Sequence, residues 1–441
     1  MPAMLRIQQI LFGQWDMVDN ETVSCIYCGC NHVSRKSRKG RLKKFVDGEG
    51  KVQEIEVYRY YCRNPECEKG SFTNLPANLV PYSPYTVDRH LLALQMYGWA
   101  GSNYRRCARA LGISSATVYR WVSAFGHDLL PVAALFGVIR SSGVIGIDEK
   151  FVKVPKNNKV KSKMSRWMYV YVAVDCYTYD LLHIRIYAHR NEATARAFLL
   201  ELRAKGYKPK AVVTDMWPKY NDLIGEIFPA ATHQECIFHA LKEVQKKIKD
   251  IYGQNYKQTS PEAVALKKQI YRIFDARTRR TAQKRYDEVM ALRSAYQEQQ
   301  AESEAIFAFL EKHWARLIPA IESVTIPRTN NTAELVIRRF DQHYQNFCGF
   351  ENIDSAQQYL AVFEKMYRFT PFSQDAQPRL RGKSPLEIAG YDISDMPMTT
   401  ICAGLNPQLG IKSADLGDRE DTQDTQEALA AAIGSLQLLE I

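Results

Sequence analysis

The 441-residue chain is longer than a typical single core, and with 46% hydrophobic residues it can build more than one, so we expect two to four domains. Lys and Arg number 59 against 48 Asp and Glu, and the net charge of +11 favours a polyanionic partner, with nucleic acid as the first candidate. No apolar run of about 18 residues occurs, and the N-terminal segment reaches a charged residue too soon for a secretory signal peptide. These features argue against membrane-spanning and secreted proteins, and we expect a cytoplasmic protein with no membrane partner.

The first predicted element is a small metal-binding unit over residues 20–75. The segment between its two cysteine pairs predicts a β-hairpin that turns at residues 47–50. In a reducing compartment, clustered cysteines indicate metal rather than disulfides, and this spacing is typical of a zinc ribbon. So small a unit lacks a core without its metal, which makes the zinc structural. The predicted zinc ligands are Cys25, Cys28, Cys62 and Cys67.

Two alternatives stay open for this unit. Cys30 or His32 could replace one of the four ligands, and the cysteines could instead be free thiols in a small core. The basic residues between Arg35 and Lys44 are either a solvated surface or a contact for phosphate groups.

Residues 83–127 predict a helix-turn-helix DNA-binding domain. Ala108 is a small residue where two helices can cross, Gly112 can take a positive φ at the turn, and Val118 anchors the second helix, expected from about Ser115. Any compact helical hairpin could show this spacing, but the surrounding arginines favour DNA. The predicted DNA-binding residues are Arg105, Arg106, Ser115, Thr117 and Arg120.

From about residue 140 the pattern changes to strands. Residues 143–154, 166–178 and 180–190 are rich in β-branched and aromatic residues and predict a three-stranded meander. A helix capped by Asn191, a buried strand "KAVVTDMW", a helix from Pro218 and a strand "AATHQEC" follow. The order β-β-β-α-β-α-β is that of an RNase H-like fold, within the α/β class.

Two carboxylates interrupt the apolar strands. Asp148 lies in the first strand and Asp215 ends the fourth, and a charge placed there is costly unless it is paired or binds a cation. Because the first and fourth strands are neighbours in this topology, the two side chains can meet. Glu149 adjoins Asp148, but successive strand residues face opposite sides, so we assign Asp148 to the site. The alternative for Asp215 is a helix cap before Pro218.

A third carboxylate, Glu334, lies near the start of a predicted helix in "RTNNTAELVIRRF". It could simply be favourable near a helix N-terminus. Together with Asp148 and Asp215, however, it would form an oxygen-rich pocket for two Mg²⁺ ions, as in-line attack on a phosphodiester requires. Arg338 and Arg339 lie about one helical turn further on and either contact DNA phosphates, balance the carboxylates or form a solvated basic face.

The motifs "GIDEKFV", "VVTDMW", "HQECIFH" and "TNNTAELVIRRF" resemble the blocks of the DDE transposases of bacterial insertion sequences. The later "RGKSPLEIAGYD" resembles a segment near the end of such enzymes. The resemblance implies a catalytic triad of Asp148, Asp215 and Glu334 holding two Mg²⁺ or Mn²⁺ ions. It also implies a nucleoid-associated bacterial protein that works as a homodimer or higher oligomer on terminal inverted repeats and target DNA.

The helix-rich residues 240–322 resemble the all-helical insertion of Mutator-like and hAT-related transposases. Cys236 and His239 resemble the Cys-x-x-His motif of those groups. Packing or a DNA contact explains this pair better than zinc does, and we do not count it among the catalytic metal ligands. Because other features occur in other groups, we assign no subfamily. The expected catalytic domain is therefore split into residues 140–239 and 323–392, and residues 393–441 read as a flexible acidic tail.

The sequence thus predicts an RNase H-like catalytic domain with an all-helical insertion, preceded by a zinc ribbon and a helix-turn-helix. The predicted function is Mg²⁺-dependent cleavage of DNA at terminal inverted repeats and transfer of the 3′-OH end to target DNA. Two alternatives remain: a domesticated or inactive sequence-specific DNA-binding protein, and a structure-specific nuclease of the same fold.

Overall fold

The protein is a mixed α/β chain that divides into two compact units. The first unit contains the described residues within 1–136, 152–167 and 339–426, and the second those within 137–151 and 168–338. Each unit is described by itself below. The computed structural model describes residues 23–25, 27–68, 70–76, 79, 83–126, 131–154 and 167–394, so nearly all of the predicted tail lies outside it.

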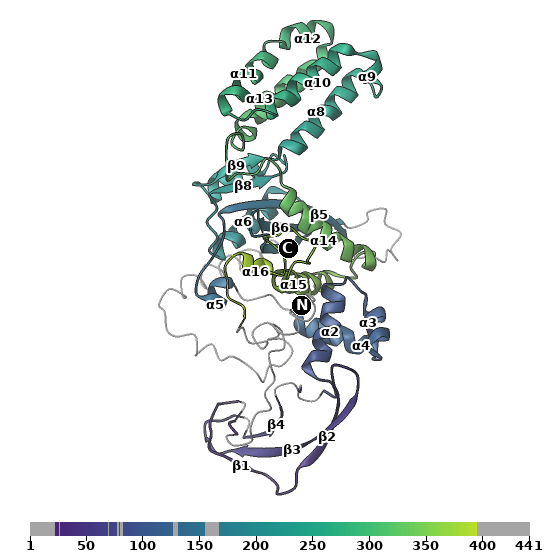
Figure 1. Cartoon of the computed structure of the whole chain (residues 1–441), viewed down its shortest axis with the longest axis vertical. Helices are drawn as coiled ribbons and strands as arrows, with labels where there is room; N and C mark the ends of the chain where they lie inside the picture. Colours follow the sequence, from purple (N-terminus) through teal and green to yellow (C-terminus); the bar gives the residue numbers. More distant parts are fainter. Residues whose placement is uncertain are drawn as a thin grey trace. The chain divides into compact units, whose positions relative to one another are not determined.

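The first unit contains a small antiparallel sheet and a group of helices (Figure 1). Its sheet has the order β1-β3-β2, with β4 also paired to β3. The predicted hairpin is confirmed, because β2 and β3 pair from Arg41↔Val57 to Val46↔Val52 around a turn that includes Gly50 at φ +88°. The elements are β1 (Val33–Arg35), β2 (Arg41–Val46), β3 (Val52–Cys62), β4 (Ser71–Asn74), α2 (Val87–Gly98), α3 (Tyr104–Leu111), α4 (Ser115–Phe125), α5 (Val132–Phe136), α15 (Ile353–Phe369) and α16 (Pro385–Ile388).

Helices α2, α3 and α4 form a compact group whose boundaries follow from local chemistry. Asn103 caps α3 by accepting a hydrogen bond from the backbone N–H of Arg106, and Ser114 caps α4 in the same way through Thr117. Gly112 ends α3 at φ +64°, a left-handed conformation that glycine adopts without steric cost. Helix α15 packs against α2 and α4 in this unit, so the three-helix group has a fourth helix as its support.

The second unit is built on a five-stranded sheet with the order β7-β6-β5-β8-β9. Strand β8 pairs in parallel with both β5 and β9, whereas β6 and β7 are antiparallel. The predicted order of strands and helices and the adjacency of the first and fourth strands are confirmed. The elements are β5 (Val144–Lys153), β6 (Trp167–Asp175), β7 (Leu181–Tyr187), α6 (Glu192–Ala204), β8 (Ala211–Thr214), α7 (Tyr220–Ile227), β9 (Thr232–Glu235) and α14 (Asn331–Phe347), of which β5, β6 and α14 each extend into the first unit.

Buried apolar side chains hold this sheet together. Val170 to Val174 of β6 are all fully buried, and Tyr171 packs on Phe198 of α6 with ring centroids 5.4 Å apart. Asn191 forms a capping box with Thr194 at the start of α6, as its predicted N-cap role requires. The helix predicted from Pro218 instead begins at Tyr220, because the residues before it form a turn.

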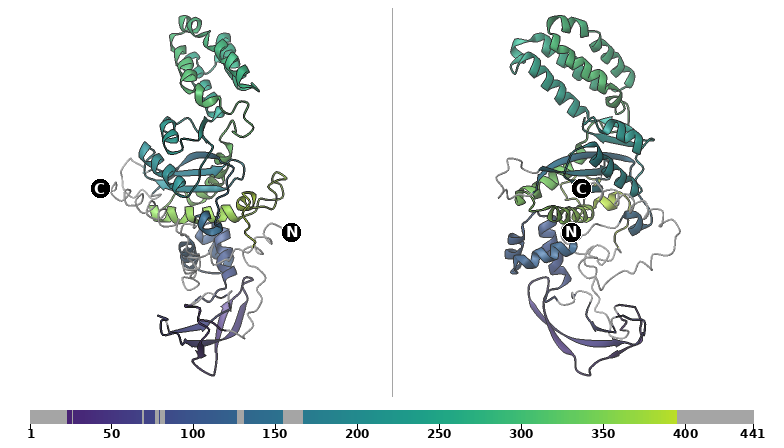
Figure 2. Two further views of the ribbon diagram at one scale, coloured as in Figure 1. Left: turned by 90° about the vertical axis from the view of Figure 1, so that its left-hand side faces the viewer. Right: turned by 180° about the vertical axis from the view of Figure 1, so that it is seen from behind.

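Between β9 and α14, every described element is helical, and these helices lie side by side in each view (Figures 1 and 2). They enclose their own core, which includes Ile270, Ile306 and Phe307. The carboxylate of Glu235, at the end of β9, accepts hydrogen bonds from Arg316 and is paired with His313, which joins the last of these helices to the sheet. The helices are α8 (Ile237–Tyr252), α9 (Tyr256–Thr259), α10 (Pro261–Phe274), α11 (Arg279–Met290), α12 (Arg293–Gln299), η1 (Ala301–Ser303) and α13 (Glu304–Leu317).

Among the helices in the described part of the chain, none is both long enough and apolar enough to cross a membrane.

Candidate functional site

The sheet aligns Asp148 with Asp215. In the parallel pairing of β5 with β8, Gly146 lies opposite Val213, and extending this register by two residues brings the two aspartates opposite each other. The four residues before Asp148 on β5 are buried, as are the four residues of β8 that precede Asp215. Asp148 therefore follows the buried run at the start of β5, which continues to Lys153, and Asp215 directly follows the end of β8.

Asp148 lies in a strongly unfavourable environment for a negative charge. Burial raises the pKa of its carboxyl to about 8, and the nearby charges of Glu149, Asp215 and Glu334 act in the same direction. Only the backbone N–H of Glu149, which donates to Oδ1 over 2.9 Å, opposes the shift. The three carboxylates assigned from the sequence thus share one electrostatic environment, which a bound cation would relieve.

Arg190, which the sequence argument did not select, joins two of the acids. Its Nη2 atom donates to Oδ2 of Asp215 over 2.7 Å and to Oε2 of Glu149 over 3.0 Å. Tyr220 donates a further hydrogen bond to Oε1 of Glu149. Burial and the charge of Asp215 nevertheless raise the pKa of Glu149 to about 7. Glu149 is therefore the partner of Arg190, while Asp148 makes no ion pair in the described residues.

Asp215 also organises the turn that follows β8. Its Oδ1 atom accepts a hydrogen bond of 2.9 Å from the backbone N–H of Trp217, and the guanidinium of Arg190 lies 4.5 Å from the centre of the Trp217 ring. Helix α7 begins only at Tyr220, after the backbone of Lys219, so Asp215 caps a turn rather than this helix. The alternative role of Asp215, as the cap of a helix starting at Pro218, is therefore wrong. Asp215 instead pairs with Arg190 and stabilises the turn after β8.

Glu334 lies in the first turn of α14, and Asn330 fixes the start of this helix. The fully buried side chain of Asn330 donates through Nδ2 to the carbonyl oxygen of Ile147 over 2.7 Å. The backbone carbonyl oxygen of Asn330 accepts from the N–H of Glu334 over 3.2 Å. Since Ile147 immediately precedes Asp148, one amide side chain sets the helix against the strand that carries the first acid. A side chain at Gly146 would lie only 2.5 Å from Oδ1 of Asn330, so glycine leaves room for this contact.

The Cys-x-x-His motif supports the same arrangement. The backbone N–H of Cys236 donates to the carbonyl of Thr214 over 2.9 Å, directly before Asp215, and its buried sulfur accepts from the backbone N–H of Asn330 over 3.4 Å. His239 has Nε2 3.8 Å from Oε1 of Glu334. Cys236 therefore links the second acid to the start of α14, and His239 faces the third acid.

The donor set fits a divalent cation that prefers oxygen. Carboxylates are the usual protein ligands of Mg²⁺ and Mn²⁺, and Oε1 of Glu334 is a buried oxygen with no hydrogen-bond partner in the described residues. Within that part of the chain, the ligand atoms of three or more His, Cys, Asp or Glu side chains come within 4.8 Å of one another only in a separate cysteine cluster. The acids thus face a common region without converging on one point.

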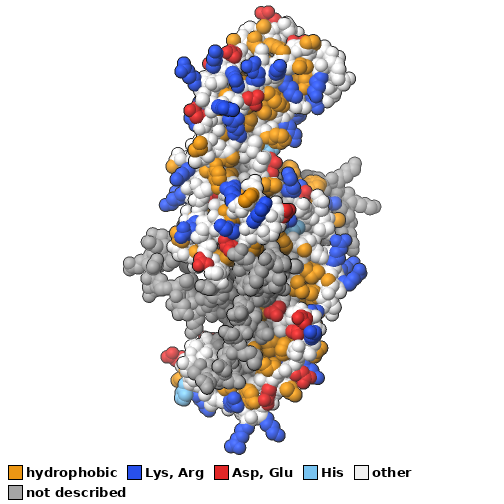
Figure 3. Space-filling view, viewed as in Figure 1, with side chains coloured by type: hydrophobic (Ala, Val, Ile, Leu, Met, Phe, Trp, Pro, Cys, Tyr) orange, Lys and Arg blue, Asp and Glu red, His pale blue; other side chains and the backbone are white. Residues whose placement is uncertain are grey.

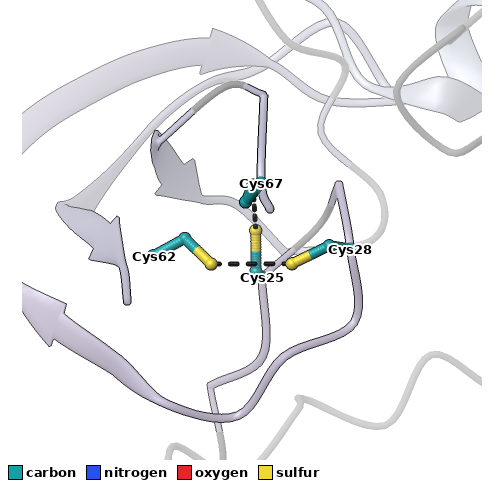
Figure 4. Close-up of side chains that lie close together, drawn as sticks. All are labelled: Cys25, Cys28, Cys62 and Cys67. Carbon is teal, nitrogen blue, oxygen red and sulfur yellow. Dashed lines mark hydrogen bonds between the residues drawn. The ribbon is translucent and has the colours of Figure 1, made fainter. Parts of the chain in front are cut away.

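That cysteine cluster consists of Cys25, Cys28, Cys62 and Cys67 in the first unit (Figure 4). The sulfur atoms of Cys25 and Cys67 are 3.8 Å apart, and those of Cys28 and Cys62 are 3.5 Å apart. A zinc ion bound tetrahedrally at ~2.3 Å requires sulfur atoms roughly 3.8 Å apart, so this geometry fits zinc.

Among the four cysteines, the surroundings favour the thiolate of Cys28, whereas burial raises the pKa of the Cys25 thiol. A hydrogen bond from the backbone of Cys30 helps to lower the pKa of Cys28 to about 6, which favours the metal-binding thiolate. The sulfur of Cys30 itself accepts from the N–H of His32 over 3.3 Å and lies outside the group of four. The two pairs chosen from the sequence are thus the ones that the fold brings together.

The predicted DNA-binding residues of α3 and α4 differ in solvent exposure and in their hydrogen bonds. Arg105, Arg106, Ser115 and Arg120 are exposed, whereas Thr117 is half-buried. The hydroxyl of Thr117 lies 2.8 Å from that of Ser114 and accepts from Nη2 of Arg120 over 3.3 Å. Contact of these residues with DNA remains a prediction.

Arg338 and Arg339 differ in solvent exposure and in side-chain contacts. Arg338 is exposed, but the guanidinium of Arg339 lies 4.2 Å from the centre of the Trp99 ring and packs there within the first unit. Arg190 supplies the ion pairs of Glu149 and Asp215, and His239 lies against Glu334. In the helical region, Arg279 and Arg285 donate hydrogen bonds to backbone carbonyl oxygens.

Comparison with known proteins gives one family match. Residues 102–358 match the model of a family described as "Transposase IS66 family", which is more than half of the chain. No curated protein matches. Among solved structures, the chain is similar to one from the "Drosophila P element transposase strand transfer complex", with 13% identity, a TM-score of 0.27, and 75% of this chain and 92% of that chain covered.

Proposed function

The chain belongs to the IS66 family of transposases, and we propose that it binds the terminal inverted repeats of a mobile element, cleaves DNA there with Mg²⁺ or Mn²⁺, and transfers the 3′-OH end to target DNA. The observation that supports the proposal is the parallel pairing of β5 with β8, whose register, extended by two residues, brings Asp148 on β5 opposite Asp215 directly after β8. Asn330 ties the helix of Glu334 to β5. In the proposed RNase H-like sheet, β5 and β8 are the first and fourth strands.

Asp148, Asp215 and Glu334 are the residues that would hold the cations. When bound, two such ions would supply Lewis-acid activation of water or a 3′-OH and would stabilise the oxygen that leaves. The raised pKa of Asp148 means that its proton must be lost before the carboxylate can bind a cation. Arg190 holds Asp215 and Glu149 in place, and Asn330 keeps the helix of Glu334 against the strand of Asp148.

The first unit supplies the proposed contacts with DNA outside the cleavage site. The four cysteines would hold a structural zinc ion that fixes the small sheet, and the exposed face of α4 would enter the major groove. Exposed Arg105, Arg106 and Arg120 suit phosphate or base contacts. Because two ends of an element must be processed together, we include a homodimer or higher oligomer in the proposal.

A cleavage assay separates this proposal from its two alternatives. The full chain is incubated with a labelled DNA fragment that carries an end of the element, with Mg²⁺, Mn²⁺ or Ca²⁺. We expect nicking and joining with Mg²⁺ or Mn²⁺. Binding without cleavage in either metal would favour an inactive DNA-binding protein, and cleavage without joining of the 3′ end would favour a nuclease.

A further inference from the structure

A cleft of about 1100 Å³ lies beside Asp215 in the second unit. One wall is the turn after β8, including Trp217, and a second is helix α8. Tyr271 of α10 and Phe309 of α13 also line it. The volume is that of a site for a small ligand, so it suits a few nucleotides of one DNA strand rather than a duplex.

Helix α8 presents a regular row of side chains to this cleft. Phe238, Lys242, Lys246 and Lys249 all line it, and their spacing of four, four and three residues places them on one face of the helix. Lys249 lies eleven residues after Phe238, which corresponds to about 16 Å along the axis at ~1.5 Å per residue. We call these four residues the α8 row. It begins next to His239, which faces Glu334, and leads away from the acids.

The lysines of the α8 row differ from other lysines of the same region. Lys247, on the same helix, is 3.8 Å from Glu243 and lies 5.5 Å from the centre of the Phe309 ring. In the described part of the chain, no ion pair involves Lys242, Lys246 or Lys249. Glu243 and Asp250 of the same helix also line the cleft, and Glu243 is paired with Lys247, so the three lysines of the α8 row are not neutralised by it.

Figure 3 shows Lys and Arg side chains spread over the helical region in that view, so positive charge alone does not single out this cleft. What distinguishes the α8 row is the aromatic ring at its start. Phe238 is 54% exposed, although it lies in the first turn of α8 beside buried Ile237. Trp217 is already covered by the guanidinium of Arg190, whereas the described neighbour of the Phe238 ring is His239, with ring centroids 5.8 Å apart.

We propose that the α8 row binds an unpaired stretch of one DNA strand next to the acids, with a base stacked on Phe238 and the following phosphates held by Lys242, Lys246 and Lys249. An exposed aromatic ring stacks most readily on an unpaired base, because a paired base must first be unstacked from its neighbours, and a row of cations can follow a single backbone. This inference rests on the proposed function, because it takes DNA as the substrate of the neighbouring acids.

The test measures binding without catalysis, using the full chain, Ca²⁺ in place of Mg²⁺, and fluorescence anisotropy. One probe is a 30-base-pair duplex with a 3′ extension of six thymidines, and the other is the same duplex with blunt ends. We expect the triple variant Lys242→Ala, Lys246→Ala and Lys249→Ala to bind the extended probe about tenfold more weakly and the blunt probe within about twofold of wild type. For the extended probe, the slope of log affinity against log salt concentration should be smaller in magnitude by about 2 in the triple variant than in wild type.

The matched control removes three exposed lysines of the same helical region that do not line the cleft: Lys257→Ala, Lys268→Ala and Lys284→Ala. It should bind both probes like wild type. Equal losses in the two triple variants, or no preference of wild type for the extended probe, would overturn the inference. Because no cleavage is measured, failure of the acids in the cleavage assay leaves this result unchanged and separately interpretable.

A second measurement examines the aromatic contact. With 2-aminopurine as the first unpaired base of the extension, stacking on Phe238 should alter its fluorescence on binding. We expect Phe238→Ala to lose at least half of this change and Phe238→Tyr, which keeps the ring, to retain it. The same change in wild type and Phe238→Ala would overturn the assignment of the stacking contact.

Discussion

Nη2 of Arg190 donates a hydrogen bond of 2.7 Å to Oδ2 of Asp215, and the same nitrogen reaches Glu149 over 3.0 Å. The guanidinium lies between two carboxylates that repel each other, and its own pKa is raised by both of them, although burial acts in the opposite direction. Arg190 thus supplies the positive charge that the acids need in the ion-free protein. In the proposed complex with DNA, the same group would be close enough to Asp215 to meet a substrate phosphate there.

Removing the charge of Arg190 should destabilise the protein. In Arg190→Met, buried Glu149 loses its cation, and we expect the free energy of unfolding to fall by about 2–3 kcal/mol in chelator-free buffer without Mg²⁺. Urea denaturation measures the loss. The control is Arg196→Met on α6, whose pairs with Glu192 and Glu226 are largely exposed, and it should cost under about 1 kcal/mol. Equal losses would contradict a special role for Arg190.

Loss of the Asn330 side chain should change the Mg²⁺ concentration that cleavage requires, but not the affinity for DNA. In Asn330→Ala the carbonyl of Ile147 loses its donor and α14 loses its tie to the strand of Asp148. We expect the Mg²⁺ concentration for half-maximal cleavage to rise about tenfold, an effect comparable to other losses of ligand orientation. Affinity for DNA in Ca²⁺ should stay within about twofold.

The neighbouring substitution Asn331→Ala serves as the control for Asn330, because Asn331 is exposed. Its metal titration should match that of wild type. Identical titrations for the two variants would show that the buried hydrogen bond does not position Glu334.

The raised pKa of Asp148 predicts a particular dependence of stability on pH. The carboxyl has a usual value of 3.8 and about 8 in the folded protein, so between pH 4 and pH 8 the folded state holds a proton that the unfolded state releases. This contribution to stability is present at low pH and is lost as the pH rises towards 8. Asp148→Asn removes the titrating group, so it should be more stable than wild type at pH 8, by about 2 kcal/mol, and similar at pH 4.

Thermal and urea unfolding of ion-free wild type and Asp148→Asn at pH 4 to 8 check this prediction. Mg²⁺ at about 10 mM, enough to occupy a weak carboxylate site, should stabilise wild type at pH 8. It should therefore reduce the difference in unfolding free energy between wild type and Asp148→Asn. A difference that does not change with pH would mean that Asp148 is not buried among the other acids.

The geometry of the cysteine cluster predicts that its four cysteines, and not Cys30, bind one zinc ion. Cys62→Ser should reduce the zinc content from about one ion per chain to near zero and unfold the small sheet, because four ligands close the site. Cys30→Ser, in the same loop region but outside the group of four, should keep its zinc. Zinc measurement by mass spectrometry and amide exchange of β1 to β4 give the two readouts. Loss of zinc in both variants would contradict the assigned ligand set.

Much of the second unit could be predicted from the sequence because β5, β6 and β7 are long and rich in apolar residues and β8 is a short apolar run. Asp148 interrupts the first of these runs, and Asp215 directly follows the last. The order of elements then implies which strands are neighbours, and so that these two acids can meet. The cysteine pairs could be predicted for a similar reason, since each pair is local and its spacing suits a metal.

The partners of the acids could not be predicted in this way. Arg190 follows β7, at one edge of the sheet, and nothing in "YAHRNEAT" indicates that it reaches Asp215 after β8. Asn330 is an ordinary polar residue before a helix until the fold buries it against Ile147. Arg339 likewise looked like a free cation, because the ring of Trp99 lies far away in sequence. Each contact depends on tertiary structure that local patterns do not contain.

The central claim is that Asp148, Asp215 and Glu334 form one metal-dependent site for DNA strand transfer. The most direct measurement compares wild type with Glu334→Gln in cleavage and joining of a DNA fragment that carries the element's end, with Mg²⁺ or Mn²⁺. Asp341→Asn, on the same helix, is the control. We predict that Glu334→Gln binds the fragment normally but loses cleavage and joining by at least about a thousandfold, while the control stays active. Full activity of Glu334→Gln would contradict the account.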